Sequence, residues 1–209
     1  LTNPYIRREY TASLELMAMM LDYYEYTGDE TFLQKTLLPV SDSLLEFWDK
    51  HYQNDENGFM KMYPAQALET LQDAENPTTD IAGLMWVLEG LLTLPQEKAT
   101  ATRTTFWKHL QEKVPPLPME QRGSRKIILG ASKVFGGRGN SENPELYAVF
   151  PFRLFGVGKP DLETGRRTFE RRTVKGNNGW RQDDTQAAML GLTQIAADYI
   201  VERAKTKHT

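Results

Sequence analysis

The chain has 209 residues, of which 40% are hydrophobic and 25% charged, a composition typical of a soluble globular protein with one well-buried core. Its net charge of −3 argues against a nucleic-acid-binding surface, and no apolar run approaches the roughly 18–20 residues of a membrane span. The absence of cysteine excludes disulfides and thiolate metal sites, and we recognise no signal peptide.

The N-terminal part predicts two helices joined by a tight link. The apolar residues of the first helix recur at the spacing of a single helix face: Leu14, Met17, Leu21 and Tyr24. Gly28 suits the C-cap of this helix, and Asp29 suits the N-cap of the next. The second helix is predicted over about residues 30–52, with Pro39 kinking or dividing it. Together the two helices predict an antiparallel hairpin.

The middle of the chain predicts a second helical hairpin and then a long loop. Residues 54–64 combine turn residues with a short extended run. Helical periodicity returns over 79–94, and Pro95 opens a further helix that extends to about residue 114. From 115 to 144 the periodicity fails, and this long loop contains one short predicted strand, KIILGAS.

The C-terminal part predicts helices at about 161–173 and 181–205. The last helix has an apolar face formed by Leu192, Ile195, Ala196, Tyr199 and Ile200. Basic residues gather at 166–175, but Glu163 and Glu170 are interleaved with them, which predicts a solvated helix face. A succession of helical hairpins joined by polar loops predicts an all-α fold with minor β structure in the loops, in a single domain over 1–209.

The sequence offers little for a metal or a cofactor. The histidines, His51, His109 and His208, are far apart, and none has the spacing of a helical metal motif. The glycine-rich segment 130–140 lacks both the Lys-Ser/Thr ending of a phosphate loop and the strand–helix setting of a dinucleotide site. We therefore expect no metal and no cofactor.

Carboxylates remain as candidate catalytic groups. Inverting hydrolysis of a glycosidic bond needs an acid that protonates the leaving oxygen and a base that activates water, roughly 6.5–9.5 Å apart. Glu69 has apolar sequence neighbours, which favour a protonated carboxyl. Asp183 and Asp184 follow Trp180, and other aromatic residues of the kind that stack on sugars are Tyr147, Phe150 and Phe152. From spacing alone, the two aspartates could equally complement a helix dipole and the aromatic residues could belong to the core.

Several segments resemble, in order, those of the six-hairpin (α/α)6-toroid glycosidases, in particular the inverting α-L-fucosidases and uncharacterised bacterial relatives. The matching segments are YPAQALET (63–70), NPTTD (76–80), ELYAVFP (145–151), RRTFERR (166–172) and NGW (178–180). The resemblance implies a glycoside hydrolase with Glu69 as the general acid, while Asp80 caps or complements the helix that it opens. Asp183 is our candidate for the base or for substrate binding, Trp180 for a sugar platform, and further candidates for substrate binding are Glu142, Glu145, Tyr147 and Asp184.

The resemblance also has departures. The segment NSENPELY (140–147) replaces one that carries histidines in the fucosidases, so fucose specificity is not expected to carry over. A complete toroid needs about twelve helices, and only about half are predicted here. With Leu1 at the start instead of Met, we expect a processed form or part of a longer catalytic domain, whose uncovered apolar faces would favour self-association.

Two other classes of function remain open at this stage. A helical scaffold or carbohydrate-binding module would keep the toroid and lack catalysis. A polysaccharide lyase on the same toroid would use a tyrosine with a basic partner, for which Tyr147 and Arg153 are candidates. The expected partner in every case is an oligosaccharide or polysaccharide, and the resemblance implies a periplasmic or secreted location.

Overall fold

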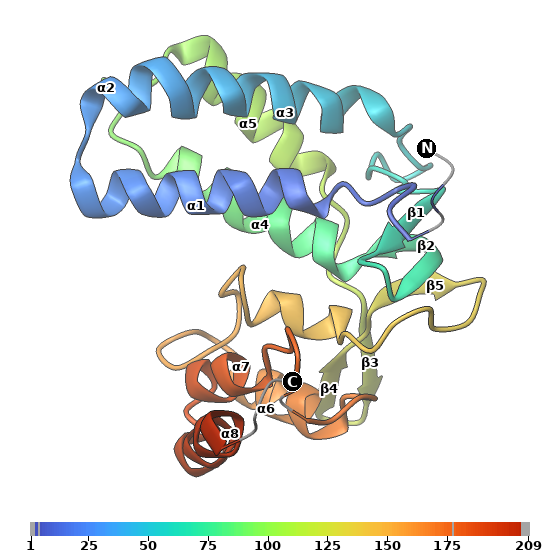
Figure 1. Cartoon of the computed structure of the whole chain (residues 1–209). Helices are drawn as coiled ribbons and strands as arrows, with labels where there is room; N and C mark the ends of the chain where they lie inside the picture. Colours follow the sequence, from blue (N-terminus) through green and yellow to red (C-terminus); the bar gives the residue numbers. More distant parts are fainter. Residues whose placement is uncertain (1–2, 4, 177, 206–209) are drawn as a thin grey trace.

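The computed structural model describes residues 3, 5–176 and 178–205. Its N-terminal half consists of two layers of helices, with α1 beside α4 and with α3 and α5 in the second layer (Figure 1). The helices of this half are α1 (Thr11–Thr27), α2 (Glu30–Phe32), the π-helical turn η1 (Leu33–Leu37), α3 (Leu38–His51), α4 (Thr78–Leu92) and α5 (Ala101–Lys113).

The predicted first hairpin is confirmed at its link. Leu14 and Met17 are fully buried on α1, as the helical periodicity requires. Gly28 has a φ of 63°, and its backbone N–H donates to the Tyr24 carbonyl at 2.8 Å. Asp29 caps the following helix by accepting a hydrogen bond from the Phe32 backbone N–H at 3.0 Å. The chain therefore reverses here through local capping chemistry.

The second predicted helix is divided. The segment Leu33–Leu37 is a π-helical turn, and α3 begins directly after it at Leu38. Pro39 lies in the first turn of α3, directly after the π-helical turn, and the helical backbone runs on through both. The proline therefore coincides with a change of hydrogen-bond pattern within a helical run, since it cannot donate a backbone hydrogen bond.

The prediction of an all-α fold is wrong, because the chain forms two small antiparallel sheets and is mixed α/β. The first sheet has the order β1-β2-β5, and the second pairs β3 with β4. The strands are β1 (Ala65–Ala67), β2 (Leu71–Pro77), β3 (Met119–Arg122), β4 (Arg125–Ile128) and β5 (Ala131–Val134). Three of these strands lie in the predicted loop 115–144, where β5 pairs with β2 through Ala74 and Val134. Such pairing joins segments far apart in the sequence, which local periodicity does not reveal.

The C-terminal helices form a separate group on the other side of α1 and α4 in Figure 1. They are the 3₁₀ turn η2 (Pro144–Ala148), α6 (Leu162–Arg171), α7 (Asp183–Met189) and α8 (Thr193–Lys205). The predicted last helix is divided near Gly191, which has a φ of 67°. Its predicted apolar face is wrong in part, because Ile195 is 40% and Ile200 57% exposed.

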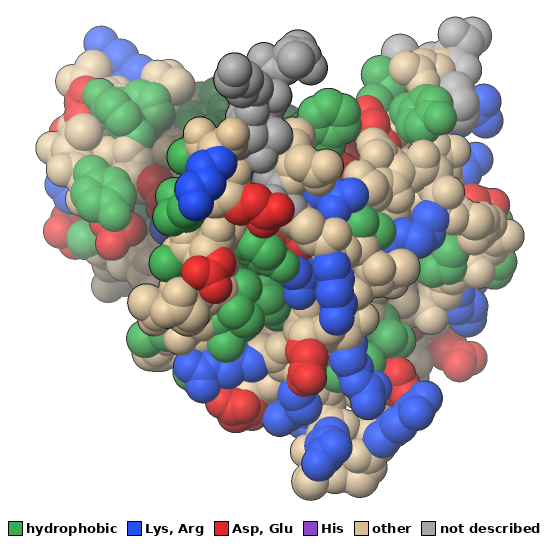
Figure 2. Space-filling model, turned by 60° about the horizontal axis from the view of Figure 1, so that its bottom comes forward, with side chains coloured by type: hydrophobic (Ala, Val, Ile, Leu, Met, Phe, Trp, Pro, Cys, Tyr) green, Lys and Arg blue, Asp and Glu red, His purple; other side chains and the backbone are tan. Residues whose placement is uncertain are grey.

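The basic segment 166–175 is only partly a solvated face. Arg166 pairs with Glu163 on the surface of α6, as predicted. Figure 2 shows Lys and Arg side chains in several groups on this side of the molecule, with Asp and Glu side chains between them. Arg172, by contrast, is buried, because it leaves the end of α6 towards the interior and pairs with Asp183.

Helix α1 also presents an uncovered apolar row to the outside. Its exposed members recur at helical spacing: Leu16, Met19, Tyr23 and Tyr26. Whether further helices or a second copy cover this row stays a prediction. Within the described residues, no helix has both the length and the apolar character that crossing a membrane requires.

Helices α1 and α4 approach each other closely at Gly83. A Cβ atom at Gly83 would lie 2.7–2.8 Å from Leu14 and Phe152 atoms, including the Leu14 Cβ. We expect Gly83→Ala to lower the free energy of unfolding by about 1–3 kcal/mol, measured by chemical denaturation, because the core is overpacked. Gly90→Ala is the matched control in the same helix, since its nearest contact is the flexible end of Leu21 at 3.0 Å. Equal stabilities of the two variants would contradict the packing argument.

Candidate active site

Glu69 lies on the tight turn that joins β1 to β2. Leu68, the residue before it, has a φ of 54°, a conformation that a leucine adopts only when its surroundings hold it there. The Glu69 side chain is half-buried, and its Oε2 atom accepts a hydrogen bond from Asn140 Nδ2 at 2.8 Å. The turn therefore presents one carboxyl group in a defined orientation.

The segment 138–142 wraps around this turn. Gly139 donates its backbone N–H to the Thr70 carbonyl at 2.8 Å, and the Thr70 hydroxyl donates to Glu142 Oε2 at 3.1 Å. A Cβ atom at position 139 would lie 2.5 Å from Gln72 Nε2 and 2.9 Å from the Glu69 carbonyl oxygen. Glycine is required for this close approach, so the glycine-rich segment has a structural role beside the candidate acid.

Two further carboxylates belong to the same region, and sequence reasoning missed both. Glu9 precedes α1, and Glu15 lies in its second turn. Burial raises the pKa of Glu9 to about 7, and the neighbouring charges of Glu15 and Glu142 add to this rise. Burial and the Glu142 charge also raise the pKa of Glu15. No local pattern distinguishes these two acids from ordinary surface residues of a helix start.

Tyr147 links this acidic group to the start of α7. Burial is the main cause that raises the pKa of its hydroxyl, followed by the charges of Glu15 and Glu142. A hydrogen bond joins the Tyr147 hydroxyl to the Gln182 side chain. We call Glu9, Glu15, Glu69, Glu142 and Tyr147 the acidic cluster. Of the predicted site residues, the structure thus brings together Glu69, Glu142 and Tyr147.

Asp80 is fully buried behind this cluster, and it does not cap α4 in the way expected. It lies in the first turn of the helix, but Oδ1 accepts a hydrogen bond from the Thr11 hydroxyl of α1 at 2.5 Å. Oδ2 has no hydrogen-bond partner among the described residues. Burial raises the pKa of Asp80 well above its ordinary value, and the Glu9 charge contributes. Asp80 therefore ties α4 to the start of α1.

The raised pKa of Glu9 predicts a pH-dependent stability. Between pH 4.5 and about 7, the folded state keeps a proton that the unfolded state has lost. The free energy of unfolding should therefore fall as the pH rises through this window, by at most about 3 kcal/mol for this group. We expect Glu9→Gln to flatten the dependence, measured by urea unfolding at pH 5 and pH 8. An unchanged dependence in Glu9→Gln would be the contrary result, and Glu25→Gln, at an exposed position of α1, is the control.

Glu145 and the two predicted aspartates are held in structural contacts. Glu145 is buried in η2, and burial raises the pKa of its carboxyl. Asp183 is 2% exposed and accepts a hydrogen bond from Arg172 Nε at 2.5 Å. Asp184 pairs with Arg203 of α8 at 3.5 Å. Both aspartates lie in the first turn of α7, where negative side chains also complement the helix dipole, the alternative that the sequence left open for them.

Trp180 lies apart from these contacts. It is 72% exposed in the turn before α7, three residues ahead of the buried Asp183. An exposed indole is compatible with a sugar platform, because one apolar face is free of the core. None of the interactions described joins it to the acidic cluster, so its role stays a prediction.

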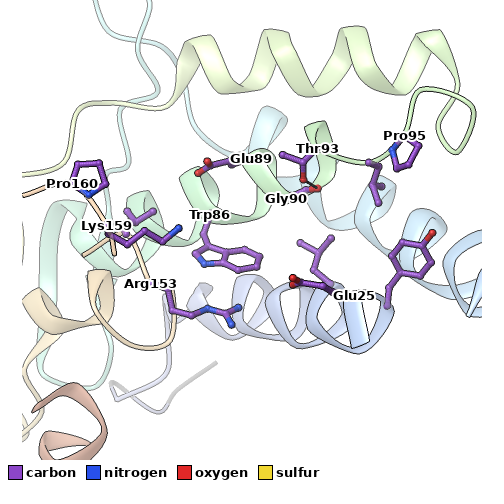
Figure 3. A pocket seen from close by; sticks show the side chains of 13 residues that line it. Glu25, Trp86, Glu89, Gly90, Thr93, Pro95, Arg153, Lys159 and Pro160 are labelled. Atoms are coloured by element: carbon purple, nitrogen blue, oxygen red, sulfur yellow. Dashed lines mark hydrogen bonds between the residues drawn. The ribbon is translucent and has the colours of Figure 1, made fainter. Parts of the chain in front are cut away.

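The basic partner proposed for a lyase lies elsewhere. Arg153 pairs with Asp22 at 2.6 Å and stacks over Trp86 at 4.4 Å. Together with Lys159 it lines a cavity of about 700 Å³ between the C-terminal parts of α1 and α4, shown in Figure 3. Tyr147 has different neighbours, namely the carboxylates of the acidic cluster. The structure therefore offers no tyrosine–arginine pair for the lyase alternative among these residues.

Metal binding gains no support from the described residues, in which no group of three His, Asp or Glu side chains is arranged to hold an ion. His51 and His109 lie on different helices, α3 and α5. His208 lies outside the described residues. The titratable side chains gathered at this site are the carboxyl groups of the acidic cluster and the Tyr147 hydroxyl.

Comparison with known proteins agrees with this chemistry. The family model of the glycosyl hydrolase family 95 catalytic domain matches residues 5–194, which include every member of the acidic cluster. No curated protein matches the chain. The match covers well over half of the 209 residues and all of the segments on which the resemblance to six-hairpin glycosidases rested. The chain belongs to the glycosyl hydrolase family 95 catalytic domain family and is a six-hairpin glycoside hydrolase.

Proposed function

We propose that the protein cleaves a glycosidic bond with inversion and that Glu69 protonates the leaving oxygen. The observation that carries the proposal is the placement of Glu69. It stands on a strained turn, its Oε2 atom is bonded to Asn140, and further partly buried carboxylates lie nearby. Partly desolvated carboxyl groups in one place are what acid–base cleavage of a glycoside requires.

Asp183 is the proposed base. A base must accept a proton from water, and the Asp183 carboxyl is held in one orientation by Arg172, whose Nε lies 2.5 Å from its Oδ1. Its neighbour Gln182 interacts with the Tyr147 hydroxyl, which supports a position of the start of α7 close to the acidic cluster. Asp183→Asn tests the role, because amide replacement removes a base and azide supplied in solution can then replace the attacking water. Activity that stays at the parental level would remove Asp183 from the mechanism.

The charge of the cluster favours a substrate without acidic groups. Glu142 interacts electrostatically with Glu69, and any negative charge on this pair would repel a uronic acid or a sulfated sugar. The substrate proposed here is a neutral glycan, and fucose is not singled out. The same argument disfavours the lyase, whose substrate carries a uronic carboxylate.

The experiment is hydrolysis of a panel of aryl glycosides and oligosaccharides, with ¹H NMR of the first anomer released. Inversion predicts that the initial product has the anomeric configuration opposite to that of the substrate. The same configuration in substrate and initial product would overturn the inverting mechanism. Failure to cleave any glycoside of the panel would favour the non-catalytic scaffold or binding module.

A further inference from the structure

The segment 138–142 is the main external support of the turn that carries Glu69. Arg138 forms a bridge with Leu71 in β2, and its guanidinium donates to the Glu142 carbonyl oxygen. Gly139 donates its backbone N–H to the Thr70 carbonyl, so the segment and the turn are joined backbone to backbone at positions 138 and 139. This segment belongs to no helix or strand and follows β5 by only a few residues. Its position is therefore set by these contacts with the turn.

The amide of Asn140 has only one orientation that satisfies its neighbours. Its Oδ1 atom accepts the Ser141 backbone N–H at 2.7 Å, which directs Nδ2 towards Glu69. An amide nitrogen only donates, so it pairs with a Glu69 oxygen that carries no proton. The transferable proton of Glu69 must then reside on the other oxygen, Oε1. The hydrogen bond from Asn140 thereby determines which oxygen of Glu69 can donate a proton to the substrate.

Glu142 also restrains the turn that carries Glu69. Its Oε2 atom accepts the Thr70 hydroxyl, one residue after Glu69. The carboxyl is about half-buried, and the Arg138 charge partly balances it. A buried carboxylate bonded to a turn hydroxyl restrains the backbone more than a surface contact would.

We propose that Asn140 and Glu142 are positioning residues: Asn140 directs the proton-bearing oxygen of Glu69 to the glycosidic bond, and Glu142 holds the backbone of the turn. The inference rests on the proposed role of Glu69 as proton donor. Neither residue exchanges a proton with the substrate, so both act through Glu69.

Leaving-group dependence separates this role from a merely structural one. The dinitrophenolate of a 2,4-dinitrophenyl glycoside leaves without protonation, whereas the phenolate of a phenyl glycoside needs a proton from the general acid. We expect Asn140→Ala to lower kcat for the phenyl glycoside by roughly 10–100-fold, the worth of a hydrogen bond to a charged group, with KM little changed. The dinitrophenyl substrate should lose less than about twofold.

Asn140→Asp keeps the shape and the Ser141 contact but removes the donor. The proposal expects it to lose as much as Asn140→Ala, while a packing role would preserve its activity. Glu142→Ala should show the same leaving-group pattern, and Glu142→Gln, which keeps an acceptor for Thr70, should recover most of the loss. Ser132→Ala, on the exposed side of β5, is the matched control, and thermal unfolding checks that each variant is folded.

The outcomes distinguish the two proposals. If Glu69→Gln shows the leaving-group pattern and the Asn140 variants lose activity equally on both substrates or not at all, the positioning roles are refuted while Glu69 stands. If Glu69→Gln itself lacks the pattern, the proposed function fails and this inference fails with it. If the Glu69, Asn140 and Glu142 variants all lose more activity on the phenyl than on the dinitrophenyl glycoside, the result supports both the acid role of Glu69 and the positioning roles.

Discussion

Replacing Glu69 with glutamine is expected to lower kcat/KM for a phenyl glycoside by ~10²-fold or more. Glutamine keeps the shape of the side chain and can still contact Asn140, but it carries no transferable proton. Protonation of the leaving oxygen usually contributes roughly 10²–10⁴-fold to such a reaction. The measurement is steady-state hydrolysis at the pH optimum of the parent enzyme.

The control for this substitution is Glu75→Gln in the same sheet. Glu75 is bonded to Lys133 of β5 and has no contact with the turn at Glu69 among those described. It should retain parental activity. If Glu69→Gln also does so on the phenyl substrate, Glu69 is not the general acid, and the other members of the acidic cluster become the candidates.

Replacing Arg172 with methionine is expected to lower the free energy of unfolding by about 3–5 kcal/mol. Both side chains of the Arg172–Asp183 pair are 3% exposed, so the substitution leaves a buried, unpaired carboxylate. Arg172 also donates to the Phe169 carbonyl and the Tyr199 hydroxyl and stacks over the Phe169 ring at 3.7 Å. It therefore joins the end of α6 to α7 and α8, and its loss should loosen all three.

Chemical denaturation of five proteins tests this network: the parent, Arg171→Met, Arg172→Met, Asp183→Leu and the double variant. Arg171→Met changes the exposed neighbouring arginine and should stay within about 0.5 kcal/mol of the parent. Adding Asp183→Leu to Arg172→Met removes the unpaired charge and should recover part of the loss. A double variant less stable than Arg172→Met by the full effect of Asp183→Leu would show that the pair is not coupled.

Local chemistry predicted much of the helical half. Gly28 and Asp29 provide the C-cap and N-cap that end one helix and begin the next, and both need only the residues beside them. The apolar spacing of Leu14 and Met17 likewise indicates a buried face, because helix geometry is the same in any fold. Prediction failed where the decisive partner is distant. The polar strand β2 is held by β5, about sixty residues later, so it has no local signal.

The candidate site divides in the same way. Glu69 could be proposed as the acid from sequence because its segment resembles, in order and spacing, those of six-hairpin glycosidases, and the match over 5–194 shows a glycoside hydrolase. Asn140 could not be singled out, since its only distinguishing feature is a hydrogen bond across 71 residues of sequence. The buried pairing of Asp183 with Arg172 was likewise hidden, because a charge pattern does not tell a surface pair from a buried one.

By itself, the sequence indicated a six-hairpin glycosidase with candidate carboxyl groups, and it determined the helix boundaries that depend on caps and periodicity. Only the tertiary structure decided which carboxylates stand together, which ones are tied into ion pairs, and how the Glu69 turn is held. The physical reason is that capping and helical periodicity act over a few residues. Burial, strand pairing and the electrostatic environment of an acid arise from segments that meet only when the chain folds.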